Sequence, residues 1–526
     1  MPSDDRNVPA PAASFDGGTL DCGSGLLLLI RQHIDPLREG QILAIASSEA
    51  SVCEDLPAWC RMTGNELVSE ERGEGRYRFL VSKGKFGAAP SAAAAEPPAR
   101  PRMPGREILP VRIPDSLPSP APAPAIPALA VMGIGSWPRP RWMLQALHEY
   151  LDGRLPEADF QATADDAAQL ALDAQLAAGV DVVTDGEQRR DNYASFVASR
   201  LDNCQLVPIT DLMPYVEDPE EFERELRALD VPAGKVRHPA VLGPLSRSRP
   251  IAVHELEFVR RRTSLPVKVA LPGPYLLTRT MWMECVSDMA YADREALAED
   301  VVRVLREEIH FLLASGAALV QLDEPVLSEV VFGGAVAGNR TFMCGALGAR
   351  RDTPEELAFA EDLLLRATRG LPPERLALHV CRGNWTPDET VALRGDYRPL
   401  AGLLARAPVG TLFLEMATPR AGEMEVLAGI PRDKRIGVGV VNQKIPEVEP
   451  LDVVLGRAQH AVDVFGAERV LLNPDCGFAT FADNPVASAE IARGKLAVAV
   501  EAARILRKRH FPLSEPGTPG PGSRGR

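Results

Sequence analysis

Three short apolar stretches, far apart in the chain, each end in residues that can bind a metal ion. They are Leu376–Gly383, which carries His379 and Cys381, Leu412–Glu415, and Leu472–Gly477, which carries Cys476. On a strand, His379 and Cys381 point to the same face, because side chains alternate with a period of two. Imidazole, thiolate and carboxylate groups suit tetrahedral zinc. Such distant ligands can meet only in a fold that gathers several strand ends at one point.

Residues 128–510 alternate strand-like apolar segments with helical patterns. The strand-like segments end at Ser136, Gly186, Pro274, Pro325, Gly383, Met416, Asn442 and Gly477. The helical patterns cover Ala164–Ala178, Arg294–Ser315, Pro354–Arg369 and Leu451–Gly466. This alternation predicts an α/β fold of the (β/α)8 TIM-barrel type, whose active sites lie at the C-terminal ends of the strands. The polar, acidic stretch Pro208–Arg249 is predicted to be an insertion after the second strand.

A smaller α+β unit is predicted to precede the barrel, at residues 16–87. Its pattern indicates a helix at Leu26–Leu37, a strand at Gln41–Ser47, a helix at Val52–Thr63 that ends at Gly64, and a strand at Arg76–Val81. Residues 88–127 are rich in proline and alanine, which predicts a semi-rigid linker. Residues 1–15 and 511–526 are predicted to be disordered tails.

Bulk properties exclude several classes of function. A formal net charge of -14 and a pI near 5.3 argue against a nucleic-acid or anionic-membrane partner. No apolar run approaches the roughly 18 residues of a membrane span, and the acidic N-terminus lacks a signal-peptide pattern. Eight cysteines in 526 residues do not make a disulfide framework. We therefore predict a cytoplasmic protein, in which Cys204, Cys285 and Cys344 are ordinary buried thiols.

Four motifs accompany the strand ends, and one of them contains Cys476. They are Gly133-Ile-Gly-Ser-Trp-Pro138, Asp185-Gly-Glu-Gln-Arg-Arg-Asp191, Gln321-Leu-Asp-Glu-Pro325 and Asn473-Pro-Asp-Cys-Gly477. In this order they resemble the catalytic barrel of cobalamin-independent methionine synthase. The resemblance implies that Zn2+ binds the sulfur of homocysteine and is itself held by His379, Cys381, Glu415 and Cys476. It also implies that Ser136 contacts the carboxylate of the substrate, while Glu187 and Asp323 contact its ammonium group.

The chain departs from this family at two points. The family has an additional N-terminal barrel that helps to bind methyl-folate, and here the small unit stands in its place. The family's Asp-x-His segment after the seventh strand reads Val441-Asn-Gln-Lys-Ile-Pro446, so that Lys444 or Asn442 replaces a proton-transferring histidine. We therefore predict Glu187, Asp323 and Lys444 as catalytic residues. The methyl donor stays open between methyl-folate and a methylcorrinoid protein, because the single barrel resembles the shorter, core-type synthases.

Two segments of the small unit resemble the TusA-like sulfur-carrier family. They are Leu56-Pro-Ala-Trp-Cys-Arg-Met-Thr-Gly-Asn-Glu-Leu67 and Tyr77-Arg-Phe-Leu80. That family carries a persulfide on a Cys-Pro-x-Pro cysteine at the start of its first helix. Here the position reads Gly25-Leu-Leu-Leu-Leu-Ile30, and Cys22 lies upstream, out of register. The departure favours a regulatory or docking role over sulfur transfer, with a sulfur-transfer protein as a candidate partner.

Three functions are open at this point. The leading hypothesis is a zinc-dependent methyltransferase that converts homocysteine to methionine. The alternatives are an S-methyltransferase that acts on another thiol with a methylcorrinoid donor, and a non-catalytic adaptor of sulfur metabolism. Single residues also have plainer interpretations: His379 could be a core histidine, Glu415 could pair with an arginine, and Glu187 could form a salt bridge. Either Asp323 or Glu324 could cap a helix instead.

Overall fold

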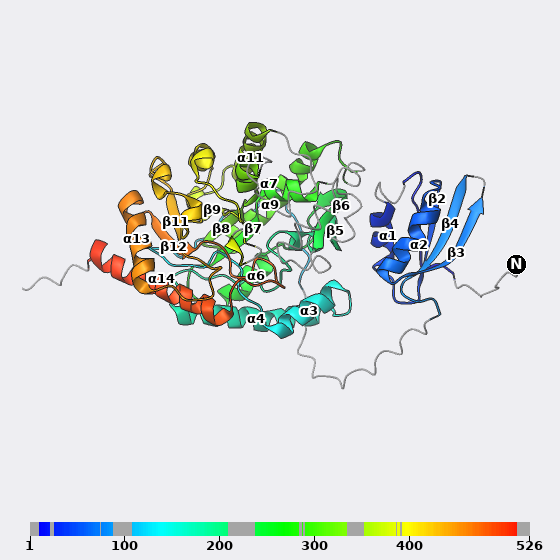
Figure 1. Ribbon diagram of the computed structural model, residues 1–526, viewed down its shortest axis with the longest axis horizontal. Coiled ribbons are helices and arrows are strands. Elements are labelled where there is room, and N and C mark those ends of the chain that lie inside the picture. Colours follow the sequence, from blue (N-terminus) through cyan, green and yellow to red (C-terminus); the bar gives the residue numbers. More distant parts are fainter. Residues whose placement is uncertain are drawn as a thin grey trace, which may run out of the picture.

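The computed structural model contains two folded units (Figure 1). It describes residues 10–20, 26–73, 75–87, 108–208, 237–282, 287, 290–333, 352–384, 387–389 and 392–512. Within these residues, no helix is both long and apolar enough to cross a membrane.

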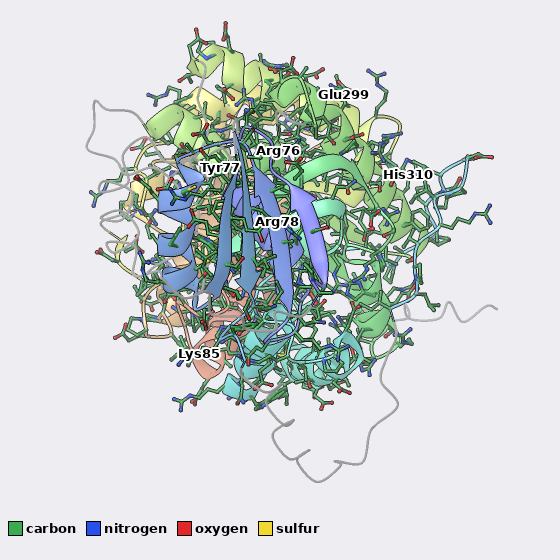
Figure 2. All side chains as sticks on the ribbon, turned by 90° about the vertical axis from the view of Figure 1, so that its right-hand side faces the viewer. Arg76, Tyr77, Arg78, Lys85, Glu299 and His310 are labelled. Atoms are coloured by element: carbon green, nitrogen blue, oxygen red, sulfur yellow. The ribbon has the colours of Figure 1, made fainter. Side chains whose placement is uncertain are left out.

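The N-terminal unit is a four-stranded sheet with two helices packed on one face (Figure 1). Its strands are β1 (Ala13–Asp16), β2 (Ile42–Ser47), β3 (Glu66–Gly73) and β4 (Arg76–Ser82), in the spatial order β1-β2-β4-β3. Only the β1–β2 pair is parallel. The helices are α1 (Leu26–Ile34) and α2 (Val52–Thr63). Figure 2 looks onto the open face of the sheet, which carries the exposed Arg76 and Arg78.

The elements of this unit match the sequence predictions in part. Helix α2 has the predicted bounds, because Gly64 follows it with a φ of 74°. Helix α1 ends at Ile34 and not at Leu37, since a residue before Pro36 disfavours helical backbone. Strands β1 and β3 were not predicted. Strand β1 lies partly within residues 1–15, where we expected disorder, so the folded unit begins earlier than residue 16.

The second unit is a closed barrel of parallel strands. Six strands follow one another in sequential order: β7 (Lys268–Pro272), β8 (Leu319–Asp323), β9 (Leu376–Val380), β10 (Thr411–Leu414), β11 (Arg435–Val441) and β12 (Val470–Pro474). Two shorter segments close the ring through parallel bridges, in which Val131 pairs with Leu472, Met132 with Val182, and Val183 with Val267. The predicted (β/α)8 barrel is confirmed.

Helices surround the ring of strands (Figure 1). They are α3 (Arg141–Leu151), α4 (Glu157–Ala178), α6 (Val253–Arg260), α7 (Pro274–Met281), α9 (Arg294–Ala314), α10 (Val326–Phe332), α11 (Thr353–Thr368), α12 (Ala401–Arg406), α13 (Leu451–Phe465) and α14 (Ala489–His510). Short 3-10 helices cover Ser195–Ser199, Pro373–Arg375, Arg398–Leu400, Pro419–Ala421 and Met424–Leu427. Helices α9, α11 and α13 match their predicted spans to within one residue. Helix α4 begins earlier than predicted, after Pro156, because its polar first turns hide the apolar period.

Two connecting regions pack against the barrel. Strand β5 (Asp202–Pro208), which ends where the predicted insertion begins, pairs antiparallel with β6 (Arg237–Ser246) inside the insertion, whereas residues 209–236 lie outside the described part. The second half of the predicted linker contacts the barrel. The Pro118 carbonyl accepts a hydrogen bond from His310, which is labelled in Figure 2, and the Ile126 carbonyl accepts one from Arg435.

Apolar side chains fill the barrel interior toward the N-terminal ends of the strands. This cluster contains Ala130, Met132, Ile134, Val182, Leu319, Ala377, Phe413 and Leu471, with Ile126 of the linker packed against it. The interior at that end is therefore closed to solvent. Polar side chains that follow the strands gather at the opposite, C-terminal end, where the candidate residues lie.

Candidate metal and substrate site

Three of the predicted metal ligands converge at the C-terminal ends of two barrel strands, β9 and β12, which are separated in the sheet by β10 and β11. His379 lies on β9, Cys381 follows this strand, and Cys476 follows β12. The Sγ atom of Cys476 is 3.6 Å from Nε2 of His379 and 3.7 Å from Sγ of Cys381. The three candidate ligand atoms lie within 4.8 Å of one another. One imidazole and two thiols at this spacing fit a zinc ion.

The backbone prepares the imidazole of His379 for metal binding. Its Nδ1 atom is 3.2 Å from the carbonyl oxygen of Phe413, which can only accept a hydrogen bond. Nδ1 therefore carries the proton, and the lone pair of Nε2 faces the two thiols. The hydrogen bond from the Cys476 thiol lowers the pKa of Cys381, against the opposing effect of burial. A thiol prepared in this way readily becomes a thiolate ligand.

The fourth predicted ligand, Glu415, is engaged elsewhere. Its Oε2 atom accepts a hydrogen bond of 2.9 Å from the backbone N–H of Arg382, and its Oε1 atom lies 2.7 Å from the guanidinium of Arg420. The structure thus brings together His379, Cys381 and Cys476 but pairs Glu415 with an arginine. The assignment of Glu415 as a zinc ligand stays a prediction.

The Asn-Pro-Asp-Cys-Gly motif ties two strand ends together. Asp475 accepts hydrogen bonds of 2.8 Å from the backbone N–H groups of Met416 and Ala417, which follow β10. Gly477 is required by a close approach, because a Cβ atom there would lie 2.1 Å from Oγ of Ser136. The motif therefore places Cys476 next to the other two candidate ligands, His379 and Cys381, and it places Ser136 against the same turn.

A pocket opens beside the three metal ligands, and its empty space, including the solvent at its mouth, is about 530 Å³. Its lining consists of Ile134, Ser136, Glu187, Tyr193, Asp323, Pro325, His379, Cys381, Asn384, Cys476, Gly477, Thr480 and Phe481. The three predicted substrate contacts, Ser136, Glu187 and Asp323, all belong to this lining. The pocket thus combines a metal-binding corner with two buried acids and a hydroxyl group.

Glu187 reaches the pocket through an unusual backbone conformation. Its φ of 54° lies in the left-handed region, and Arg139 holds the turn by donating hydrogen bonds to the carbonyl oxygens of Glu187 and Arg190. Gly135 leaves room opposite for this position of the carboxylate, since a Cβ there would lie 2.0 Å from Oε1 of Glu187. Burial raises the pKa of Glu187 to about 7, against the opposing effect of Arg190, whose guanidinium is 3.9 Å away.

Asp323 and Glu324 divide two roles at the end of β8. Glu324 accepts hydrogen bonds from the backbone N–H groups of Tyr275 and Leu276, at 2.8 and 2.9 Å, and so caps the start of α7. Asp323 lines the pocket and accepts a hydrogen bond of 2.6 Å from Gln321. Burial raises the pKa of Asp323, which His379 counteracts. The helix-capping alternative therefore applies to Glu324, and Asp323 remains available to a substrate.

Lys444 lies outside the pocket lining. Its side chain is buried, and this burial lowers its pKa, while the nearby Arg420 lowers it further. The neighbouring Asn442 donates a hydrogen bond of 2.6 Å to Glu389. A catalytic role for Lys444 stays a prediction.

Several site residues were not predicted. Asn384 donates hydrogen bonds to the Gly477 carbonyl and to Thr480, at 2.6 and 2.7 Å. Tyr193 and Phe481 meet edge to face at 6.5 Å and form an aromatic wall of the pocket. Both wall residues lie in loops, where no periodic pattern marks them. Arg139 follows Trp137-Pro138 directly, so its proximity to a motif was the only available signal.

The geometry is that of a parallel barrel with a cluster of potential metal ligands and a pocket at the C-terminal ends of its strands. The family model for the catalytic domain of cobalamin-independent synthase matches residues 129–352 and 375–505, and the chain belongs to this family. A second model, for the sulfurtransferase TusA, matches residues 25–83. The resemblance inferred from the motifs is confirmed for both units, and with it the assignment to a methyltransferase family.

Known proteins of similar sequence and fold cover the barrel. A methionine synthase of Saccharolobus solfataricus is 25% identical over 384 residues, which span 73% of this chain and 96% of that protein. A methionine synthase of Pyrococcus abyssi is 26% identical over 384 residues, with 73% and 94% covered. A solved B12-independent methionine synthase from Shewanella sp. W3-18-1, in complex with selenomethionine, is 24% identical, with a TM-score of 0.54 and 73% and 100% covered. The structural likeness supports the barrel fold.

Proposed function

We propose that this chain is a zinc-dependent methyltransferase that transfers a methyl group to the thiol of homocysteine and so forms methionine. The observation that carries the proposal is the convergence of His379, Cys381 and Cys476 at the edge of a pocket with two buried acids. The relatives named methionine synthase support the choice of substrate. Their similarity extends over nearly their whole length, so the comparison concerns the complete barrel.

Zinc would be held by His379, Cys381 and Cys476, with Glu415 proposed as the fourth ligand. When bound there, the ion supplies the positive charge that keeps an alkyl thiol deprotonated at neutral pH, whereas a free thiol has a pKa near 8.5. The Phe413 carbonyl holds the imidazole in the required tautomer. Glu415 now contacts Arg420 through Oε1 and the N–H of Arg382 through Oε2, and a carboxylate has further lone pairs with which it could bind the ion.

The pocket residues would orient the amino-acid part of the substrate. Glu187 and Asp323 offer carboxylate oxygens to the ammonium group. Ser136 accepts a hydrogen bond of 3.3 Å from the N–H of Ala479, so its hydroxyl proton is free to be donated to the substrate carboxylate. Each of these contacts recognises one charged group of an α-amino acid. The acceptor is therefore proposed to be an amino-acid thiol and not a simple alkyl thiol.

Methyl transfer forms a sulfur–carbon bond while the bond between donor and methyl group breaks. The leaving atom of a folate donor then needs a proton, and Lys444 is the proposed source. A methylcorrinoid protein would need no such proton. Both donors remain candidates. Lys444→Met should lose activity with methyl-folate and keep it with a methylcorrinoid protein, and this difference would distinguish them.

Cobalt-substituted protein, titrated with L-homocysteine, tests the proposal. Cobalt(II) replaces spectroscopically silent zinc, and a new thiolate ligand changes its ligand-field and charge-transfer absorption. We expect a saturable change that is absent from Cys476→Ser and retained by Cys60→Ser, whose thiol lies in the N-terminal unit. Stoichiometric cobalt without a response to homocysteine would refute the substrate and favour another thiol. Absence of bound cobalt would refute the enzymatic proposal and favour an adaptor.

We further infer that the N-terminal unit docks a partner and does not carry sulfur. Cys53 and Cys60 are buried in the apolar core of the unit, and burial raises the pKa of both, that of Cys60 to about 12. Such thiols are poor nucleophiles. Cys22, the remaining candidate of the sequence, lies outside the described residues. Transfer of persulfide sulfur to the native chain from a cysteine desulfurase, abolished by Cys22→Ser, would contradict this inference.

A further inference from the structure

A buried lysine inside the barrel is connected to the substrate pocket by two hydrogen bonds. Lys268 begins β7, and its Nζ atom lies 2.6 Å from Oε1 of Gln321 and 4.3 Å from the centre of the Phe413 ring. The Nε2 atom of Gln321 lies 2.6 Å from Oδ1 of Asp323. Among the described residues, no carboxylate lies within ion-pair distance of Lys268. Its ammonium group therefore meets an amide oxygen and an aromatic face.

This chain of hydrogen bonds has a fixed direction. An ammonium group can only donate, so the amide of Gln321 must turn its oxygen toward Lys268. Its NH2 group must then face Asp323, whose Oδ1 atom must accept. The orientation of an amide follows from such a network, because oxygen and nitrogen are assigned from their partners. Lys268 thereby fixes the orientation of the Gln321 amide, whose NH2 group then donates a hydrogen bond to Asp323.

The charges around Lys268 all belong to the proposed site. Burial lowers the pKa of Lys268, and the groups that oppose this effect are Asp323, Glu187 and Cys476. A buried cation is costly without a partner. The free-energy cost of burying the Lys268 ammonium is offset by nearby negative charge. This charge comes from the two acids that we propose to bind the substrate ammonium group and from one proposed metal ligand.

We propose that Lys268 is a positioning residue that acts through Gln321 to hold Asp323 in the orientation that recognises the α-ammonium group of the substrate. With Oδ1 held by Gln321, the second carboxylate oxygen remains for the ligand. Lys268 does not reach the pocket lining, so it contacts neither the substrate nor the metal. The inference rests on the proposed function, and it assigns the preference for an amino-acid thiol to residues below the pocket.

The test compares two thiols that differ only in the amino group. Cobalt-substituted protein is titrated with L-homocysteine and with 4-mercaptobutanoate, and the dissociation constants are read from the absorption change. We expect Lys268→Met to weaken binding of L-homocysteine about tenfold or more, the size expected for a charge-assisted hydrogen bond. Binding of 4-mercaptobutanoate should change less than about twofold, because this ligand makes no contact with Asp323 through an ammonium group.

Two further variants separate positioning from structural damage. Gln321→Met removes the intermediate amide and should give the same selective loss, and the double variant should bind no more weakly than either single one, because all three interrupt one chain. Lys434→Met is the matched control. Lys434 is also a buried lysine, but it donates to the backbone carbonyls of Ala407 and Val409, away from the pocket. It should leave the preference between the two thiols unchanged.

Different outcomes refute different statements. Equal weakening of both thiols by Lys268→Met and Gln321→Met, or no weakening, overturns the positioning role. Losses that multiply in the double variant overturn the connection through Gln321. If Lys268→Met does not fold, Gln321→Met alone decides between these outcomes. A wild-type protein that binds neither thiol refutes the proposed function, and this result is visible before any variant is made.

Discussion

The two units of the molecule place cysteines in opposite chemical situations at the same degree of burial. In the barrel, Cys381 and Cys476 are 4% and 7% exposed, and in the N-terminal unit, Cys53 and Cys60 are 8% and 2% exposed. Only the barrel thiols meet an imidazole and each other. Burial alone therefore does not decide whether a thiol can react. The neighbouring polar groups decide it, and these are set by the fold.

The difference arises from where each cysteine lies in its element. Cys53 and Cys60 lie on one face of α2 together with Leu56 and Trp59, and this face packs against the sheet. A helix face that covers a sheet is surrounded by apolar side chains. The barrel cysteines lie just beyond strand ends, where the chain leaves the apolar interior. A cysteine on the buried face of α2 is therefore a packing residue, whereas a cysteine just beyond a barrel strand can act as a metal ligand.

The largest effect is expected from removal of one thiol in each unit. Cys381→Ala should lower the affinity for zinc at least about 100-fold, because it removes a direct ligand, whereas loss of an indirect partner already costs 10- to 100-fold. Cys60→Ala should leave metal binding unchanged. Metal content after dialysis against a chelator of known affinity measures both. Equal losses in the two variants would end the distinction between the units.

Metal loading should stabilise one unit and not the other. A ligand at about 1,000 times its dissociation constant stabilises the folded state by about 4 kcal/mol. We expect this gain in the barrel, where the ligands come from strands β9 and β12. Hydrogen exchange with and without zinc reports the two units separately. Slower exchange in α2 as well would show that the N-terminal unit senses the metal site.

Glu187 extends the comparison from thiols to carboxylates. Its pKa in the metal-free fold is raised from 4.5 to about 7 by burial. Between these values the folded chain keeps a proton that the unfolded chain releases, so the stability contributed by this group falls as the pH rises. Glu187→Gln removes this dependence. The difference in free energy of unfolding between the variant and wild type should therefore shift by about 3 kcal/mol in favour of the variant as the pH rises from 4 to 8.

Chemical denaturation of both metal-free proteins across this range measures the effect. The relative stability of the variant must rise mainly between pH 4.5 and 7, because in this range Glu187 binds a proton in the folded wild-type chain but not in the unfolded one. Parallel stability curves for wild type and Glu187→Gln would show that the carboxyl group is not desolvated. Glu187 would then titrate like a solvent-exposed carboxyl group, and burial would not distinguish the carboxyl groups of the barrel site from those of the protein surface.

The sequence predicted those features that depend on local pattern. The bounds of α2 and α13 follow from apolar spacing and a final glycine, and the convergence of His379, Cys381 and Cys476 follows from strand ends in a barrel. Strand β3 was missed because its sequence, Glu66–Gly73, is polar at one edge of the sheet and lacks alternation. Such an edge strand is held by its neighbour and not by its own pattern.

Contacts between distant segments could not be predicted. A carboxylate after an apolar strand needs a partner, and the sequence around Glu415 allowed either a metal or an arginine. The contact with Arg420, at 2.7 Å, is made by the loop after β10, whose path the local sequence pattern does not give. The same holds for Lys268, whose position in a strand gave no sign of its contact with Gln321 on the next strand. Which polar group meets which is a property of the assembled barrel.

The smallest predicted effect tests whether the units are independent. Gly64 ends α2 with a φ of 74°, and a Cβ atom there would meet no other atom within 4 Å. Gly64→Ala should therefore destabilise the N-terminal unit by roughly 1 kcal/mol, through backbone conformation alone. Exchange of α2 amides should accelerate accordingly. The affinity of the barrel for L-homocysteine should stay unchanged, because its ligands lie on strands that share no core with α2. A parallel loss of thiol binding would show that the N-terminal unit supports the metal site.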